Sequence, residues 1–94
     1  MKTRKRKPES YYVYMLLCDD GSYYTGYSNA PSARLVRHIK GQGARYTRMH
    51  KPEKIVYTEK HKIRRAAMRR EREIKAMTHE KKRSLAEAAG RTRN

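Results

Sequence analysis

The sequence predicts an α/β protein of the α+β type, in which helices flank a small three-stranded antiparallel sheet. The chain has only 94 residues, a length that suits one domain. Three short segments rich in β-branched and aromatic residues are typical of strands, and helical patterns follow them. The expected order, β-β-α-β-α-α, contains too few strands for a doubly wound sheet, so an antiparallel sheet covered by helices is the economical arrangement.

The composition limits the kind of partner and the kind of protein. Lys and Arg total 25 against 9 Asp and Glu, which gives a formal net charge of +16 and predicts a strongly acidic partner. No stretch of about 18 apolar residues is present, so no membrane-spanning segment is expected. Cys18 is the only cysteine, which excludes a disulfide framework and a cysteine-rich zinc site. We therefore expect a cytoplasmic protein without a membrane partner.

Three regions are expected along the chain. Residues 1–10 (MKTRKRKPES) hold five Lys or Arg and no apolar periodicity, which predicts a flexible basic arm. Residues 11–90 carry all the strand and helix patterns and are expected to form a single domain. Residues 91–94 are expected to be a disordered basic tail.

Strands are expected at residues 11–17, 22–27 and 54–59, each rich in β-branched or aromatic side chains. The first two lie close in sequence and are separated by Asp20-Gly21, a strong hairpin signal. These two strands are therefore expected to pair as an antiparallel hairpin.

The register of this hairpin decides which tyrosines lie together. If the loop has three residues with Gly21 left-handed, Tyr14 lies opposite Gly26 and shares one face of the sheet with Tyr24. A two-residue loop would shift the pairing by one residue and separate Tyr14 from Tyr24. We favour the first register, because Gly26 then leaves room beside Tyr14 for something other than protein.

Helices are expected at residues 31–40, 62–77 and 78–89, and a basic loop is expected at residues 41–52. Gly41 and Gly90 are expected to end the first and the last helix. Apolar residues at helical spacing predict the buried faces. These are Ala33, Val36 and Ile39 in the first helix, and Ile63, Ala67, Ile74 and Met77 in the second.

The middle of the chain is basic and lacks acidic residues. From Gly21 to Pro52 there is no carboxylate, so positive charge there is not neutralised locally and suits phosphate backbones. A charge run on a solvated surface is the alternative, and it fits the mixed-sign C-terminal helices better. The residues expected to bind nucleic acid are Arg37, Lys40, Arg45, Tyr46 and Arg48, the tyrosine by stacking on a base.

Two features on the predicted helices carry candidate chemistry. Arg34 and His38 are four residues apart, so they share one helix face; an arginine suits bidentate phosphate recognition and a histidine can move a proton near neutral pH. Glu71 lies at the edge of the apolar face of the second helix. It is either salt-bridged, with Arg64, Arg72 or Lys75, or it is a ligand for a hard cation such as Mg²⁺.

The ordered set of these residues resembles the GIY-YIG nuclease superfamily. The resemblance rests on Tyr12-Val13-Tyr14, on Tyr24-Thr25-Gly26 ten residues later, and on Arg34, His38 and Glu71 in that order. It is greatest for the small stand-alone bacterial-type members, whose Gly-Lys-Gly-Ala-Lys-Tyr-Thr-Arg segment is similar to residues 41–48 here. The first motif begins with Tyr12 where the superfamily name has glycine.

The resemblance implies the GIY-YIG fold and a mechanism. It implies a divalent-metal-dependent endonuclease with one ion, Mg²⁺ or Mn²⁺, held by Glu71. Arg34 would steady the scissile phosphate, and Tyr14 and Tyr24 would orient or deprotonate the attacking water. His38 would assist proton transfer or contact phosphate. DNA is the expected substrate, with RNA as a possible one.

Two other functions fit parts of the sequence. A non-catalytic DNA- or RNA-binding module with the same fold would explain the charge and the basic ends of the chain. A ribosome-associated basic protein would also explain the charge, but it leaves the ordered motif without a reason. The oligomeric state is not indicated by any pattern.

Overall fold

The computed structural model describes residues 10–92. In chain order its elements are β1 (Tyr11–Cys18), β2 (Tyr23–Ser28), α1 (Pro31–Ile39), α2 (Arg45–Met49), β3 (Pro52–His61), α3 (Arg64–Lys75) and α4 (His79–Thr92). The expected basic arm, except Ser10, and the last two residues of the expected tail lie outside the described residues. Among the described residues, no helix is both long and apolar enough to cross a membrane.

The sheet has three antiparallel strands in the order β2-β1-β3. Strand β1 takes the centre because it carries the longest apolar run, and Val13, Tyr14, Met15 and Leu16 are all at most 1% exposed. Tyr14 pairs with Gly26 in β2, so the register expected from a three-residue hairpin loop is confirmed. Its turn residue Gly21 has a φ of 85°, a backbone conformation that favours glycine.

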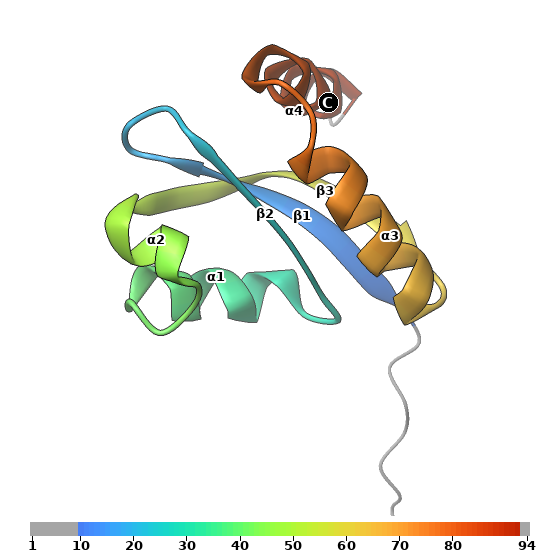
Figure 1. Ribbon diagram of the computed structural model, residues 1–94, viewed down its shortest axis with the longest axis horizontal. Helices are drawn as coiled ribbons and strands as arrows, with labels where there is room; N and C mark the ends of the chain where they lie inside the picture. Colours follow the sequence, from blue (N-terminus) through green and yellow to red (C-terminus); the bar gives the residue numbers. More distant parts are fainter. Residues whose placement is uncertain (1–9, 93–94) are drawn as a thin grey trace, which may run out of the picture.

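The sheet separates two groups of helices (Figure 1). Val13 and Met15 point to one face, where they pack in one core cluster with Ala67 and Ile74 of α3 and with Leu85 of α4. Since side chains alternate along a strand, the residues between them point to the opposite face. That face is covered by α1 and α2, which lie side by side in Figure 1.

The expected basic loop at residues 41–52 is wrong, because it contains the short helix α2. The observed order is therefore β-β-α-α-β-α-α, with the expected three-stranded sheet preserved. The Thr47 hydroxyl donates a hydrogen bond of 2.9 Å to the Ala44 carbonyl, and Thr47 is only 2% exposed. The turn is thus held by local bonding and by burial, and a five-residue helix leaves too short a pattern to be seen in the sequence.

The buried face expected for α1 is also wrong. Val36 and Ile39 are 49% and 53% exposed, and Ala33 is exposed too. The helix instead turns His38, which is 2% exposed, and half-buried Leu35 toward the sheet. A histidine occupies the most buried position of the helix because its ring nitrogens find partners inside the protein.

Helices α3 and α4 agree better with expectation. Ala67 and Ile74 are completely buried, but Ile63 is 61% exposed because it precedes α3 as its N-terminal cap. The hydroxyl of Thr78 accepts a hydrogen bond from the Lys81 amide at 3.1 Å and so caps the start of α4. Gly90 does not end this helix, which continues to Thr92.

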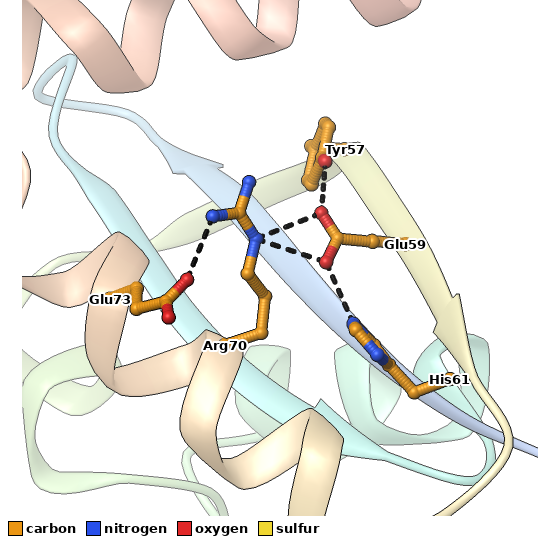
Figure 2. Close-up of polar contacts among 5 residues, drawn as sticks. All are labelled: Tyr57, Glu59, His61, Arg70 and Glu73. Atoms are coloured by element: carbon orange, nitrogen blue, oxygen red, sulfur yellow. Dashed lines mark hydrogen bonds and ion pairs between the residues drawn. The ribbon is translucent and has the colours of Figure 1, made fainter.

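A polar cluster attaches α3 to β3 (Figure 2). The Glu59 carboxylate accepts hydrogen bonds from the Tyr57 hydroxyl at 2.5 Å and from Arg70 Nε at 3.0 and 3.1 Å, and it lies 2.7 Å from His61 Nε2. Arg70 also reaches Glu73 on its own helix at 3.0 Å. Burial opposes ionisation of Glu59, but the hydrogen bonds from Tyr57, His61 and Arg70 outweigh it and keep the pKa of Glu59 below its ordinary value.

Candidate functional site

A cavity of about 370 Å³ lies where four elements meet. Its lining includes Tyr14 of β1, Tyr24 of β2, Arg34 of α1 and Glu71 of α3. The structure therefore brings together four of the five residues expected to act in catalysis or metal binding. Glu71 lies on the same side as the tyrosines, although α3 packs mainly on the other face of the sheet.

Gly26 makes the close approach of the two tyrosines possible. A Cβ atom at this position would lie 2.7 Å from Tyr14 Oη and 3.1 Å from the ring of Tyr24. Both distances are shorter than an ordinary van der Waals contact allows, so a side chain here would displace one of the phenols. The tyrosine ring centroids are 6.4 Å apart, and both residues line the same cavity.

His38 lies behind Tyr14 and not on the surface. Its Nε2 is 3.1 Å from Tyr14 Oη, and its Nδ1 is 2.7 Å from Thr47 Oγ1. Both ring nitrogens therefore have partners inside the protein, although the ring also contributes to the lining of a neighbouring cavity. Of the two roles that the resemblance implies for His38, these bonds favour proton transfer through Tyr14 over direct phosphate contact.

Glu71 takes the salt-bridged alternative, with Lys75 as its partner. Its side chain is 16% exposed and pairs with Lys75, whose Nζ lies 3.3 Å away. The same carboxylate lines the cavity with the tyrosines and Arg34. The Lys75 ammonium also lies 6.0 Å from the centre of the Tyr24 ring.

Burial and neighbouring charges set the protonation of the site. Burial raises the pKa of Tyr14 well above its ordinary value, with nearby Tyr24 and Glu71 acting in the same direction, and Arg34 opposes them. Burial and Glu71 likewise raise the pKa of Tyr24, against Arg34. The pKa of His38 is lowered by burial and by Arg34 and Arg37. At neutral pH both phenols and the imidazole are therefore uncharged.

The side chains of the site suit a cation of the magnesium type. They do not suit a metal ion that requires all its ligands from the protein. Glu71 is the one carboxylate in the cavity lining, and the described residues contain no cluster of three or more His, Cys, Asp or Glu that could hold a metal ion. Mg²⁺ is commonly bound by one or two carboxylates together with waters and substrate phosphates. Glu71 beside an arginine suits that mode.

A second cavity, of about 290 Å³, adjoins the first. Tyr24 and Arg34 line both cavities, and the rest of the second one is formed by Arg37, His38, Gln42, Gly43 and Ala44. Among the residues that the structure describes, no carboxylate lines it. Anionic groups can therefore be accommodated on both sides of Arg34.

The other residues expected to bind nucleic acid lie on or beside α1 and α2. Lys40, Arg45 and Arg48 are exposed, and within the described residues none of them forms an ion pair with a carboxylate. Tyr46 is 37% exposed and stacks on His50, with ring centroids 4.1 Å apart and planes 19° apart. One face of this tyrosine is thus already covered by protein.

Sequence reasoning missed several residues of the site. Thr47 and Gly43 surround the His38 ring, and a Cβ atom at Gly43 would lie 2.2 Å from His38 Nδ1. Arg64 lines the first cavity and donates a hydrogen bond of 3.1 Å to the Tyr27 hydroxyl. In the sequence, Thr47 and Gly43 are distinguished only by their position in the Gly41–Arg48 segment. No pattern distinguishes Arg64 from the other arginines of α3.

Comparisons with known proteins identify the family. The family described as the GIY-YIG catalytic domain matches residues 10–84. The chain is 44% identical over 77 residues to a UPF0213 protein of Staphylococcus aureus strain Mu3, which covers 82% of this chain and 94% of the relative.

Two solved structures are also similar. The solution NMR structure of the UPF0213 protein BH0048 from Bacillus halodurans is 40% identical, covers 84% of each chain and has a TM-score of 0.53. The solution NMR structure of the protein EF2693 from E. faecalis is 37% identical, covers 94% of this chain and 90% of that chain, and has a TM-score of 0.57. By its sequence and its three-stranded fold, this chain belongs to the GIY-YIG family.

Proposed function

We propose that the protein binds nucleic acid and hydrolyses a phosphodiester bond with one divalent cation in the Tyr14–Glu71 cavity. The observation that carries this proposal is the convergence of Tyr14, Tyr24, Arg34 and Glu71 from four elements on one cavity. Two phenols, a guanidinium and a single carboxylate supply the groups that metal-assisted phosphodiester hydrolysis needs. The cavity opens beside a surface that carries unpaired positive charge.

Arg34 binds the scissile phosphate in this proposal. A guanidinium can hold two phosphate oxygens at once and stabilise the charge that builds up in the transition state. Because Arg34 lines the first cavity together with Tyr24 and Glu71, a phosphate bound to it there would lie beside both residues. Glu71 would hold the cation, Mg²⁺ or Mn²⁺, which supplies charge neutralisation at the phosphate and an acidified water when bound.

The tyrosines orient the attacking water rather than remove its proton as phenolates. A phenol with a pKa above its ordinary value stays protonated at neutral pH and is a weak base. It remains a good hydrogen-bonding group, with one donor and two lone pairs. Two such hydroxyl groups near one cavity can fix the direction from which a water approaches the phosphorus.

DNA is the proposed substrate, and α1 and α2 are its proposed docking surface. The expected contacts are Arg37, Lys40, Arg45, Tyr46 and Arg48. Arg37 lines the cavity next to the site, so the phosphate that follows the scissile one can be held there. RNA offers the same phosphate chemistry and is the alternative nucleic acid.

A second candidate function is nucleic-acid binding without hydrolysis. The specific observation in its favour is the Glu71–Lys75 ion pair at 3.3 Å. A carboxylate that is already neutralised by a lysine has less need of a cation, and in this case the cavity would hold phosphate through Arg34 and Lys75 alone.

A nicking assay on plain and branched duplex DNA with Mg²⁺ or Mn²⁺ separates these functions. Glu71→Gln is expected to lower the rate by about 100-fold or more, because it removes the anionic ligand of the cation. Glu73→Gln is the matched control, since Glu73 lies on the same helix but contacts Arg70 on the β3 side. Nicking that is equal in wild type and Glu71→Gln, or DNA binding without nicking in wild type, contradicts the catalytic proposal.

A further inference from the structure

A chain of hydrogen bonds runs from the backbone of α2 to the Tyr14 hydroxyl. The Thr47 hydroxyl is 2.9 Å from the Ala44 carbonyl and 2.7 Å from His38 Nδ1, and His38 Nε2 is 3.1 Å from Tyr14 Oη. Both His38 and Thr47 are 2% exposed. Each proton in this buried chain of hydrogen bonds can therefore lie only on one of the donor atoms that the chain contains.

The carbonyl oxygen fixes the direction of the first bond. A carbonyl only accepts, so Thr47 donates its single hydroxyl proton to Ala44. The same oxygen then has only lone pairs left for the imidazole, and His38 Nδ1 must carry the hydrogen of the 2.7 Å bond. The Ala44 amide also directs its N–H at Nδ1, which would need a lone pair there, but at 3.4 Å this hydrogen bond is the longer and weaker of the two competing contacts.

The protonation of Nδ1 determines the orientation of the Tyr14 hydroxyl. A neutral imidazole with hydrogen on Nδ1 has an unprotonated Nε2, which can only accept. Tyr14 therefore donates its proton inward to His38, and both lone pairs of its oxygen remain for the cavity. The neighbouring guanidinium of Arg34 has donors only, so it is compatible with this orientation and not with a hydroxyl proton directed at it.

We propose that Thr47 is a positioning residue that holds His38 in the Nδ1-protonated form and thereby presents the Tyr14 oxygen to the cavity as a hydrogen-bond acceptor. The proton positions do not depend on any reaction. The consequence for hydrolysis rests on the proposed function, in which an acceptor at Tyr14 orients the O–H of the attacking water toward the tyrosine and its lone pair toward the phosphorus.

The surroundings of His38 support a fixed neutral ring. The backbone of Gly43 is so close that a Cβ atom there would lie 2.2 Å from Nδ1, and the Tyr24 ring centroid is 4.9 Å from the imidazole on the other side. The charged groups near the ring are Arg34 and Arg37, and they lower its pKa together with burial. The ring is therefore both sterically held and uncharged at neutral pH.

The ¹⁵N resonances of the His38 ring test the proton positions directly, without any substrate. In wild type the Nδ1 nitrogen is expected to be the protonated one, and Thr47→Ser, which keeps the hydroxyl, is expected to preserve this state. Thr47→Val keeps the shape but removes the hydroxyl, so the Nδ1-protonated form is expected to lose its dominance. A wild-type ring protonated at Nε2 would overturn the proposal, whether or not the valine variant folds.

Kinetics test the consequence for the reaction. Thr47→Val is expected to lower kcat by roughly 10- to 100-fold with little change in KM, as a small misorientation in an active site does. Thr47→Ser should stay near wild type.

The pH dependence of kcat tests the same role, because a protonated His38 cannot accept a hydrogen bond from Tyr14. Burial, Arg34 and Arg37 hold the pKa of His38 below its ordinary value of 6.5. Wild-type kcat should therefore fall only when the pH is lowered below 6.5. Equal kcat and pH profiles in valine, serine and wild-type proteins would overturn the positioning role.

The two proposals can fail separately. A wild-type protein without nicking activity contradicts the proposed function, while the ¹⁵N spectra still decide the state of His38. Conversely, an active enzyme with an Nε2-protonated ring contradicts the role of Thr47 and leaves the function intact.

Discussion

The two charged regions of this molecule differ in how their charges are used. On the α1–α2 side, Arg34, Arg37, Arg45 and Arg48 form no ion pair with a carboxylate within the described residues. On the α3–β3 side, Arg70 pairs with both Glu59 and Glu73 at 3.0 Å (Figure 2). The four arginines of the α1–α2 side are thus left without a carboxylate, whereas Arg70 is bonded within the protein.

This difference indicates which charges stabilise the fold and which are available to bind a partner. A paired, partly buried charge such as Glu59 stabilises the packing of α3 on the sheet, because its hydrogen bonds are satisfied away from water. Unpaired exposed arginines contribute little to the fold and raise the positive potential of the surface. The net charge alone does not distinguish these uses, whereas the pairing pattern does.

The largest effect is expected from substitution of Arg34, which should lower the activity without changing the stability. Arg34→Ala should lower the nicking rate by about 100- to 1,000-fold, since the guanidinium is proposed to stabilise charge on the phosphate. It should change the free energy of unfolding by less than about 0.5 kcal/mol, because the side chain is exposed and forms no ion pair within the described residues. Parallel nicking and thermal-denaturation measurements test this separation, and a large loss of Tm would remove the contrast between the two regions.

The opposite effect is expected from Glu59. Glu59→Ala should lower the free energy of unfolding by about 2 kcal/mol, which is roughly 8–16 °C in Tm for a domain of this size, because three partly buried donors lose their acceptor. The nicking rate per folded molecule should not change. Glu87→Ala is the control, since its carboxylate is 62% exposed and lies 4.0 Å from Arg83, and it should cost less than about 0.5 kcal/mol.

Acid denaturation gives an independent check on Glu59. Its pKa in the folded state is below the ordinary value of 4.5, so its stabilising contribution is complete above pH 4.5 and is lost as the pH falls through the folded-state pKa. Urea denaturation of wild type should therefore show a loss of stability in this range that Glu59→Ala lacks. Parallel pH profiles for the two proteins would mean that the cluster does not contribute to stability.

The smallest effect is expected from single arginines at the proposed DNA-binding surface. Arg37→Gln should make the plot of log K against log salt about one unit less steep, because one phosphate contact is lost. Arg83→Gln removes the same charge from an arginine that pairs with Glu80 at 3.4 Å, and it should leave the slope almost unchanged. Equal slopes for both variants would show that total charge, and not the α1–α2 surface, determines binding.

Local patterns were sufficient to predict much of the fold. The hairpin register follows from Asp20-Gly21, because a left-handed glycine at the third loop position aligns Tyr14 with Gly26, and the structure confirms this pairing. The start of α1 at Pro31 and the cap at Thr78 also depend on neighbouring residues only. Such features are readable from the sequence because their causes lie within a few residues.

The features that the sequence did not reveal depend on distant contacts. The helix α2 is too short to show a periodic pattern, and its Thr47 is buried because it meets His38 nine residues earlier. The buried face of α1 was predicted from its apolar residues, but the structure buries His38 instead, since Tyr14 and Thr47 satisfy both ring nitrogens. Hydrophobicity alone could not predict that a polar ring would occupy this position.

The sequence by itself determined the ordered residues of the motif, the strand pairing that sets the two tyrosines on one face, and the excess of positive charge. Only the tertiary structure decided that Glu71 reaches the tyrosines from α3, that His38 lies behind Tyr14, and that some arginines are paired while others are not. The reason is physical. Turn and pairing preferences act over a few residues, whereas burial and charge pairing depend on which elements meet across the sheet.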